Sequence, residues 1–198
     1  MRDNILSAIG LAIFLVVAYV VGGWLNRFKN AKFRRAWAPL LPLLEDAKVV
    51  DDGGGAATSW LTGTYRGHHV QARMTPPRNL HSGESGDARF YDFALSLTNL
   101  KGEQDWDFQF RSTPAPGKSP WRVTADTTAL AQRLERAGIE SQLPGLGFPK
   151  ITFQRQGGLL QYQVDVTPAL VPPPDAFRRT LDFLIWMADV NRQVNTPD

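Results

Sequence analysis

The feature that most constrains the fold of this chain is a long uncharged run close to its first residue. Residues 5–25 read ILSAIGLAIFLVVAYVVGGWL, and their one ionisable side chain is the phenol of Tyr19. A helix needs roughly 20 consecutive apolar residues to cross the hydrocarbon core of a bilayer. We therefore predict a transmembrane helix over residues 5–25, preceded by an extramembrane stub over residues 1–4.

A cleaved signal peptide is the alternative to a retained anchor. The apolar region of a signal peptide covers about 7–15 residues and ends at a cleavage site of small residues. The run here is longer, and it ends in Gly22, Gly23, Trp24 and Leu25. Because an indole ring is favoured at the level of the lipid headgroups, Trp24 fits the end of a membrane-spanning helix. The sequence therefore favours a retained anchor.

A basic segment follows the run, and the first acid after it is Glu45, whereas only Arg2 and Asp3 carry charge before it. Lys and Arg are retained on the cytoplasmic side of a membrane, and near its surface they attract anionic lipid headgroups. The composition, rich in Ala, Gly, Pro and Arg, indicates a bacterial source. We predict a single-pass protein of the bacterial inner membrane, with its N-terminus outside and its domain in the cytoplasm. The residues predicted at the membrane surface are Trp24, Arg27, Lys29, Lys32, Arg34 and Arg35.

Charge and cysteine content exclude several classes of protein. Residues 1–35 contain six Lys or Arg and one acid, a net charge of +5, so a chain of net charge +3 carries −2 over its remaining residues. Since a nucleic-acid-binding domain would be basic over its own surface, we predict no nucleic-acid partner. The chain has no cysteine, which excludes disulfides, Cys-ligated zinc, iron–sulfur clusters and thiol nucleophiles.

Residues 26–50 are predicted to form the basic segment and an amphipathic helix. Within residues 31–47, the apolar side chains fall at helical spacing, although Pro39 and Pro42 favour a kink or a break. Two interpretations stay open: a helix that lies on the bilayer, or a linker that packs its leucines on the domain. The apolar side chains are Phe33, Trp37, Leu40, Leu41 and Leu44.

Residues 51–198 are predicted to form one cytoplasmic α+β domain. Alternating apolar and polar residues predict about six strands, which hairpins such as the one at Arg66-Gly67 make mostly antiparallel. A helix with Asp126 as its N-cap and Gly138 after its C-terminus separates the fourth and fifth strands, and a long helix closes the chain. The predicted order is ββββαββα. The strands are 59–65, 68–73, 90–98, 105–110, 150–155 and 160–166, and the last helix covers about 175–194.

No motif in the chain supports catalysis, cofactor binding or a metal. His68 and His69 are adjacent on a strand, so they point to opposite faces, and a metal site with His81 and Asp87 is an unfavoured alternative. Asp105 and Asp107 alternate with aromatic residues and read as an exposed acidic strip. The G-x-G of residues 143–148 lacks the third glycine and a following helix. We predict a protein that is not an enzyme and holds neither cofactor nor metal.

The last helix carries more apolar surface than one packed face requires. Its first apolar stripe begins at Phe177, and a second one lies beside it. This second stripe is either covered by a neighbouring element or exposed for a partner. The small residues of the first run would let another helix approach closely. The predicted partner interface comprises Gly10, Gly22, Gly23, Phe183, Trp186 and Val190.

These observations predict a non-catalytic accessory or scaffold subunit, which stabilises a larger membrane protein complex through its helix and its α+β domain. Its predicted partners are integral membrane subunits and anionic lipid headgroups. The alternative is a membrane-tethered domain that binds a lipid or an amphiphile in a pocket between the sheet and the last helix. The residues that would line such a pocket are Trp60, Tyr91, Phe93, Trp106 and Phe108.

Overall fold

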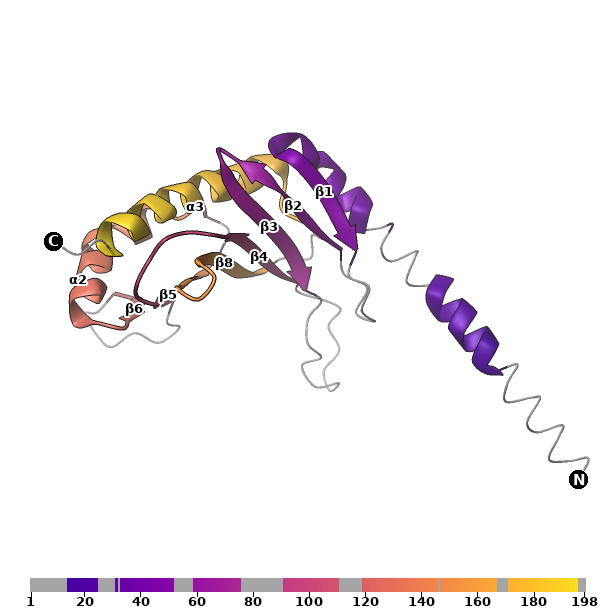
Figure 1. The fold of residues 1–198 in the computed structure, drawn as a ribbon, viewed down its shortest axis with the longest axis horizontal. Helices are drawn as coiled ribbons and strands as arrows, with labels where there is room; N and C mark the ends of the chain where they lie inside the picture. The colour runs from indigo at the N-terminus through magenta and orange to yellow at the C-terminus, as the bar shows by residue number, and fades with distance from the viewer. Residues whose placement is uncertain are drawn as a thin grey trace, which may run out of the picture.

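One antiparallel sheet of eight strands, with helices packed on one of its faces, forms the protein (Figure 1). The computed structural model describes residues 14–24, 31, 33–51, 59–75, 91–110, 119–145, 147–166 and 171–195. The strands are β1 (Glu45–Asp51), β2 (Ser59–Tyr65), β3 (His68–Thr75), β4 (Tyr91–Leu97), β5 (Trp106–Phe110), β6 (Trp121–Ala125), β7 (Lys150–Gln154) and β8 (Leu159–Val166). The helices are η1 (Ala38–Leu43), α2 (Thr128–Arg136), η2 (Ile139–Gln142) and α3 (Pro174–Asn195).

The spatial order of the strands is β1-β2-β3-β4-β8-β7-β5-β6. The strands β1 to β4 lie side by side in chain order. Because β8 then pairs with β4, the hairpin of β7 and β8 lies between these four strands and the pair β5–β6. The predicted turn at Arg66-Gly67 is confirmed. Both residues have positive φ angles, 49° and 79°, as the two-residue turn of a tight hairpin requires.

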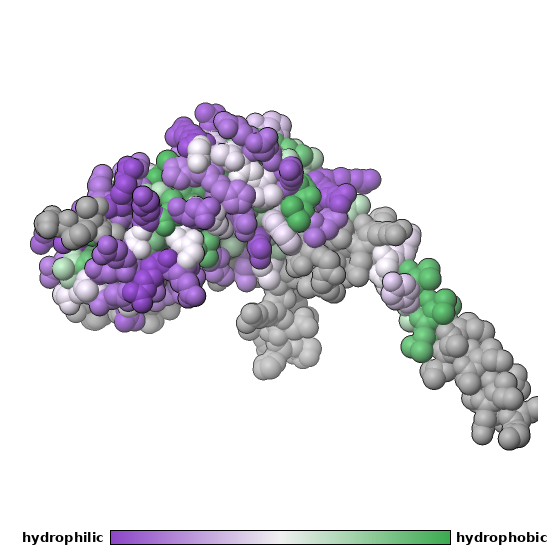
Figure 2. All heavy atoms as spheres, in the orientation of Figure 1, coloured by the Kyte–Doolittle hydropathy of each residue, from purple (hydrophilic) through white to green (hydrophobic). Residues whose placement is uncertain are grey.

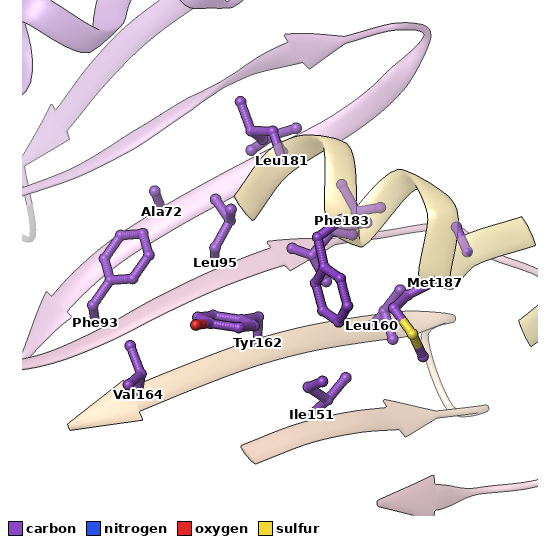
Figure 3. Packing of buried hydrophobic residues seen from close by; sticks show 14 of the residues in the cluster. Ala72, Phe93, Leu95, Ile151, Leu160, Tyr162, Val164, Leu181, Phe183 and Met187 are labelled. Carbon is purple, nitrogen blue, oxygen red and sulfur yellow. The ribbon is translucent and has the colours of Figure 1, made fainter. Parts of the chain in front are cut away.

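The core lies between the sheet and α3, which runs along the helix-bearing face (Figure 1). Every second residue of the strands points into this core from the sheet. The helix α3 fills the core from the other side with Phe177, Leu181, Leu184 and Met187. Figure 3 shows Leu181, Phe183 and Met187 directed from α3 toward the sheet. This face therefore carries the aromatic and aliphatic side chains that period-two alternation predicts.

The opposite face of the sheet is polar along a row that crosses all eight strands. Each member pairs with the next across the ladder, and no helix of the described residues packs on this row. The alternation of strand residues explains the contrast between the two faces. The row consists of Lys48, Thr62, Gln71, Ser96, Gln161, Thr152, Asp107 and Thr124.

The prediction of a transmembrane helix over residues 5–25 is wrong. Within the described residues, no helix combines the length and the apolar character that crossing a membrane demands. Of residues 5–25, the structure describes 14–24, which are helical. The predictions of a single-pass inner-membrane protein, of an outside N-terminus and of a cytoplasmic domain are corrected by the same finding.

The predicted number of strands is also corrected, from six to eight. The sequence interpretation placed β1 mostly within the basic segment and amphipathic helix of residues 26–50, because β1 is mostly charged. It assigned no element to β6, which lies between a Pro-rich stretch and the start of a helix. The N-cap of α2 is Thr127, whose hydroxyl accepts a hydrogen bond from the Leu130 amide, whereas the Asp126 carboxylate accepts one from the Asp105 amide. Gly138 follows α2 with a φ of 68°, as predicted.

The segment before β1 packs on the domain. Residues 33–37 are helical and continue into η1. Phe33, Trp37, Leu40 and Leu44 are buried in the core, and the Trp37 indole donates a 3.1 Å hydrogen bond to the Ser59 carbonyl oxygen. Of the two interpretations left open by the sequence, the structure has the linker that packs its leucines on the domain.

Candidate partner-binding site

A groove runs along the flank of α3 between this helix and the α2–η2 region. It consists of two hollows of about 500 Å³ and 390 Å³ that share Trp186, and we call it the α3 groove. Residues 142–145 line the first hollow from the far side, and α2 lines the second one. The residues contributed by α3 are Arg179, Asp182, Phe183, Trp186, Val190, Gln193 and Val194.

The residues of α3 predicted as a partner interface lie in this groove at different depths. Phe183 and Val190 are 6% and 7% exposed and belong to the core cluster, so they form the floor. Trp186 is half-buried, and its ring lies 5.8 Å from that of Phe183. Phe183 in turn packs edge-on against Tyr162 of the sheet at 6.1 Å. The indole of Trp186 is therefore held by the core and is still accessible from the groove.

Positive charge surrounds the accessible indole. Arg133, Arg136 and Arg179 line the groove, and within the described residues neither Arg136 nor Arg179 forms an ion pair. The Arg133 guanidinium donates a 3.0 Å hydrogen bond to the Val194 carbonyl oxygen, which ties α2 to the end of α3. An apolar side chain that enters between these arginines would best carry acidic neighbours.

Asp182 is the acid among the described groove residues, and it is engaged from the β2–β3 hairpin. It accepts a 2.7 Å hydrogen bond from the Tyr65 hydroxyl, and one of its oxygens lies 3.1 Å from the Arg66 guanidinium. Burial, and then the bond to Asp182, raise the pKa of Tyr65 above its usual value. Since Arg66 balances the carboxylate of Asp182, the groove as a whole stays basic.

The helix over residues 14–24 presents a second apolar surface. Figure 2 shows hydrophobic residues on its outside, and Phe14, Val16, Val20 and Trp24 are exposed. Apart from each glycine's chain neighbours and its own helix backbone, no atom of the described residues lies within 4 Å of the position that a Cβ would take at Gly22 or Gly23, so another helix could approach their backbone closely. Gly10, the third glycine predicted for this interface, lies outside the described residues.

The residues predicted at a membrane surface are only partly described. Arg27, Lys29 and Lys32 lie outside the described residues, Trp24 is exposed on the helix over residues 14–24, and Arg35 is exposed beside η1. Arg34 forms an ion pair with Asp51 at the end of β1, with one N–O distance of 3.1 Å. One cation of the basic segment thus binds the domain itself.

The histidines and carboxylates singled out in the sequence are spread over the sheet. His68 and His69 line a polar hollow of about 560 Å³, where Asp189 pairs with Arg192 at 2.7 Å. The Asp105 carboxylate accepts a 2.6 Å hydrogen bond from the Arg155 amide. In the part of the chain that the structure describes, no three His, Cys, Asp or Glu residues come together as metal ligands. His81 and Asp87 fall outside that part, so the absence of a metal stays a prediction.

The residues that would line a lipid pocket are not gathered around one cavity. Trp60 lies on the opposite face of the sheet, where the Arg73 guanidinium covers its ring at 4.7 Å. Phe93 packs against Phe177 of α3, and the Trp106 indole donates a 2.8 Å hydrogen bond to Asn191. Phe108 stacks on Trp121 at 4.8 Å. The side chain of Tyr91 is not described.

No pattern in the sequence indicates the residues on the far wall of the α3 groove. Arg133 and Arg136 read as ordinary surface residues of α2, and Gln142 and Pro144 as a connection, because their approach to α3 depends on the tertiary fold. Comparisons of the chain with protein-family models, with curated proteins and with solved structures give no match. The interpretation of the site therefore depends on its own geometry.

Proposed function

We propose that this protein is a non-catalytic accessory or scaffold subunit, which stabilises a larger protein complex by binding another subunit in the α3 groove. The observation that carries the proposal is Trp186: its indole is half-buried, is shared by both hollows and is supported from below by Phe183. Tryptophan is one of the residue types enriched among the few that dominate the energy of protein–protein binding.

The bound segment of the partner is an apolar stretch with acidic residues beside it. The apolar part covers Trp186, and the acidic part pairs with Arg136 and Arg179 at the edges of the groove. The exposed helix over residues 14–24 adds a second contact, in which Gly22 and Gly23 admit a helix of the same complex. Two contacts on one chain raise the effective concentration of each.

The wider identity of the complex stays a prediction. Integral membrane subunits and anionic lipid headgroups were predicted as partners from residues 5–35, of which the structure describes a part. The groove and the arginines at its edges require a partner surface with acidic residues. This requirement is the same whether or not the complex lies in a membrane.

The test compares two aromatic truncations in the full chain, purified from its host in mild detergent. Trp186→Ala should raise the dissociation constant of the complex at least about 30-fold, and so reduce the amount of co-purifying partner, because a hot-spot truncation costs at least about 2 kcal/mol of binding. Phe148→Ala is the matched control, since Phe148 is 66% exposed and lies outside the groove. It should leave the partner bound.

Thermal melts of the same two variants separate binding from folding. If Trp186 acts on a partner, its truncation lowers the melting temperature by only a few degrees. A loss of about 3–5 kcal/mol of stability, as for a fully buried aromatic ring, would mean that Trp186 is core and that the proposed function is wrong. Equal co-purification in the Trp186→Ala and Phe148→Ala variants would contradict the proposal as well.

A further inference from the structure

The strand β6 forms one edge of the sheet, and it has few of the features that protect edge strands. Its five residues, WRVTA, contain no acid, no proline and no bulge. Arg122 and Thr124 are exposed, and Trp121, Val123 and Ala125 are half-buried. Among the described residues, β5 is the one strand that pairs with β6, and an edge strand with an unpaired side is a template for pairing with another strand.

The other edge of the sheet, β1, has features that protect an edge strand from pairing with another chain. In β1, the register shifts between Glu45 and Lys48, and Asp46 has a φ of 51°, which marks a bulge. Four of the seven residues of β1 are charged, and Asp51 is paired with Arg34. Bulges and charges prevent edge-to-edge association, so the two edges differ in kind.

The hydrogen bonds at the ends of β6 show which of its amides face outward. The Asp126 amide donates to the Asp105 carbonyl oxygen, toward β5. Because the direction alternates along an antiparallel strand, the amides of Thr124 and Arg122 also point to β5. The amides and carbonyl oxygens of Trp121, Val123 and Ala125 then point away from the sheet. The Trp121 amide takes the Ser119 hydroxyl as its acceptor, which agrees with this outward direction.

The residues of β6 complement one another about Val123. When two copies of β6 are placed antiparallel with Val123 on the two-fold axis, Trp121 faces Ala125 of the second copy, a large residue against a small one. On the other face, Arg122 lies opposite Thr124 of the second copy, so no like charges meet directly. An isologous contact requires such self-complementarity.

We infer that β6 pairs with β6 of a second copy of this chain, and that the two eight-stranded sheets thereby join into one continuous sheet across a two-fold axis. The outward groups of Val123 in each copy exchange both of their hydrogen bonds. The contact lies at the edge strand, and no residue of the α3 groove belongs to β6. Dimerisation is therefore independent of the proposed binding of a partner subunit.

Disulfide cross-linking tests the geometry directly. The native chain has no cysteine, so Val123→Cys introduces one thiol per copy. Opposed residues of a hydrogen-bonded pair have Cα atoms about 5.5 Å apart, which a disulfide spans. Under mild oxidation, Val123→Cys should run as a covalent dimer of the 22.0 kDa chain on a non-reducing gel. Thr152→Cys, on the central strand β7, should stay monomeric. Cross-linking of both variants at one rate, or of neither, would overturn the inference.

A charge substitution tests the contact without oxidation. Thr124 and Thr152 both lie opposite Asp107 in the sheet, on β6 and β7 respectively, so an arginine at either position meets the same neighbour. Only Thr124→Arg also places an arginine opposite Arg122 of the second copy, twice per dimer. It should raise the dissociation constant of the dimer about tenfold in sedimentation experiments, and Thr152→Arg should leave it unchanged. An association that both variants leave intact, such as one through residues 14–24, would overturn the inference.

Discussion

At the scale of single residues, the hydroxyl of Tyr162 is a buried polar group that the core leaves without a partner. Tyr162 is fully buried on β8, and its Oη has no hydrogen-bond partner among the described residues. Figure 3 shows the ring among the apolar side chains between the sheet and α3. A buried hydroxyl without a partner destabilises the folded state, because it gives up its hydrogen bonds to water.

Removing this hydroxyl should therefore not destabilise the folded protein. We expect Tyr162→Phe to leave the free energy of unfolding unchanged or to raise it by about 1 kcal/mol in urea titrations, since the ring and its packing are kept. Tyr162→Ala is the contrasting variant, with an expected loss of about 3–5 kcal/mol. A loss of more than about 1 kcal/mol in Tyr162→Phe would show that the hydroxyl has a partner in the folded protein.

At the scale of elements, the predictions from sequence succeeded where the apolar periodicity was strong and failed where charged residues or flanking loop signals obscured it. The alternation of β4 and β5 and the apolar stripe of α3 placed their residues on the correct faces. The strands β1 and β6 were missed, because β1 is mostly charged and β6 lies between a Pro-rich stretch and the start of a helix. The sequence indicated the second apolar stripe of α3, to which Trp186 and Phe183 belong, but not the groove, because the arginines of α2 meet this stripe only through the packing of α2 on α3.

The element η1 permits a direct test of whether the segment before β1 is part of the domain. Leu40 is fully buried in the core, and the adjacent Leu41 is only partly buried. Leu40→Ala should lower the free energy of unfolding by about 2–5 kcal/mol through the lost contacts and the cavity left behind. The same substitution at Leu41 should have a clearly smaller effect. Equal and small losses in the two variants would mean that this segment does not stabilise the fold.

At the scale of the whole molecule, the spatial order of the strands could not be predicted from the sequence. Hairpins predict neighbours such as β2 and β3, but the pairing of β4 with β8 joins residues about 70 positions apart along the chain.

Two tyrosines connect the parts assembled in this way. Tyr65 bonds the β2–β3 hairpin to Asp182 of α3, and Tyr162 lies in the core between β8 and α3. Burial raises the pKa of both phenols.

These two phenols give the molecule a predicted alkaline limit of stability. For a phenol whose pKa is raised by folding, the free energy of unfolding is independent of this titration below the unfolded value of about 10, and it falls as the pH rises toward the folded value. The free energy of unfolding should thus be steady near pH 8–9 and should fall above about pH 10, by up to about 1.4 kcal/mol per pH unit for each tyrosine. Urea titrations at a series of pH values measure the slope. Tyr162→Phe removes one of the two titrations and should make the fall less steep. An unchanged slope in this variant would show that Tyr162 ionises as easily in the folded chain as in the unfolded one.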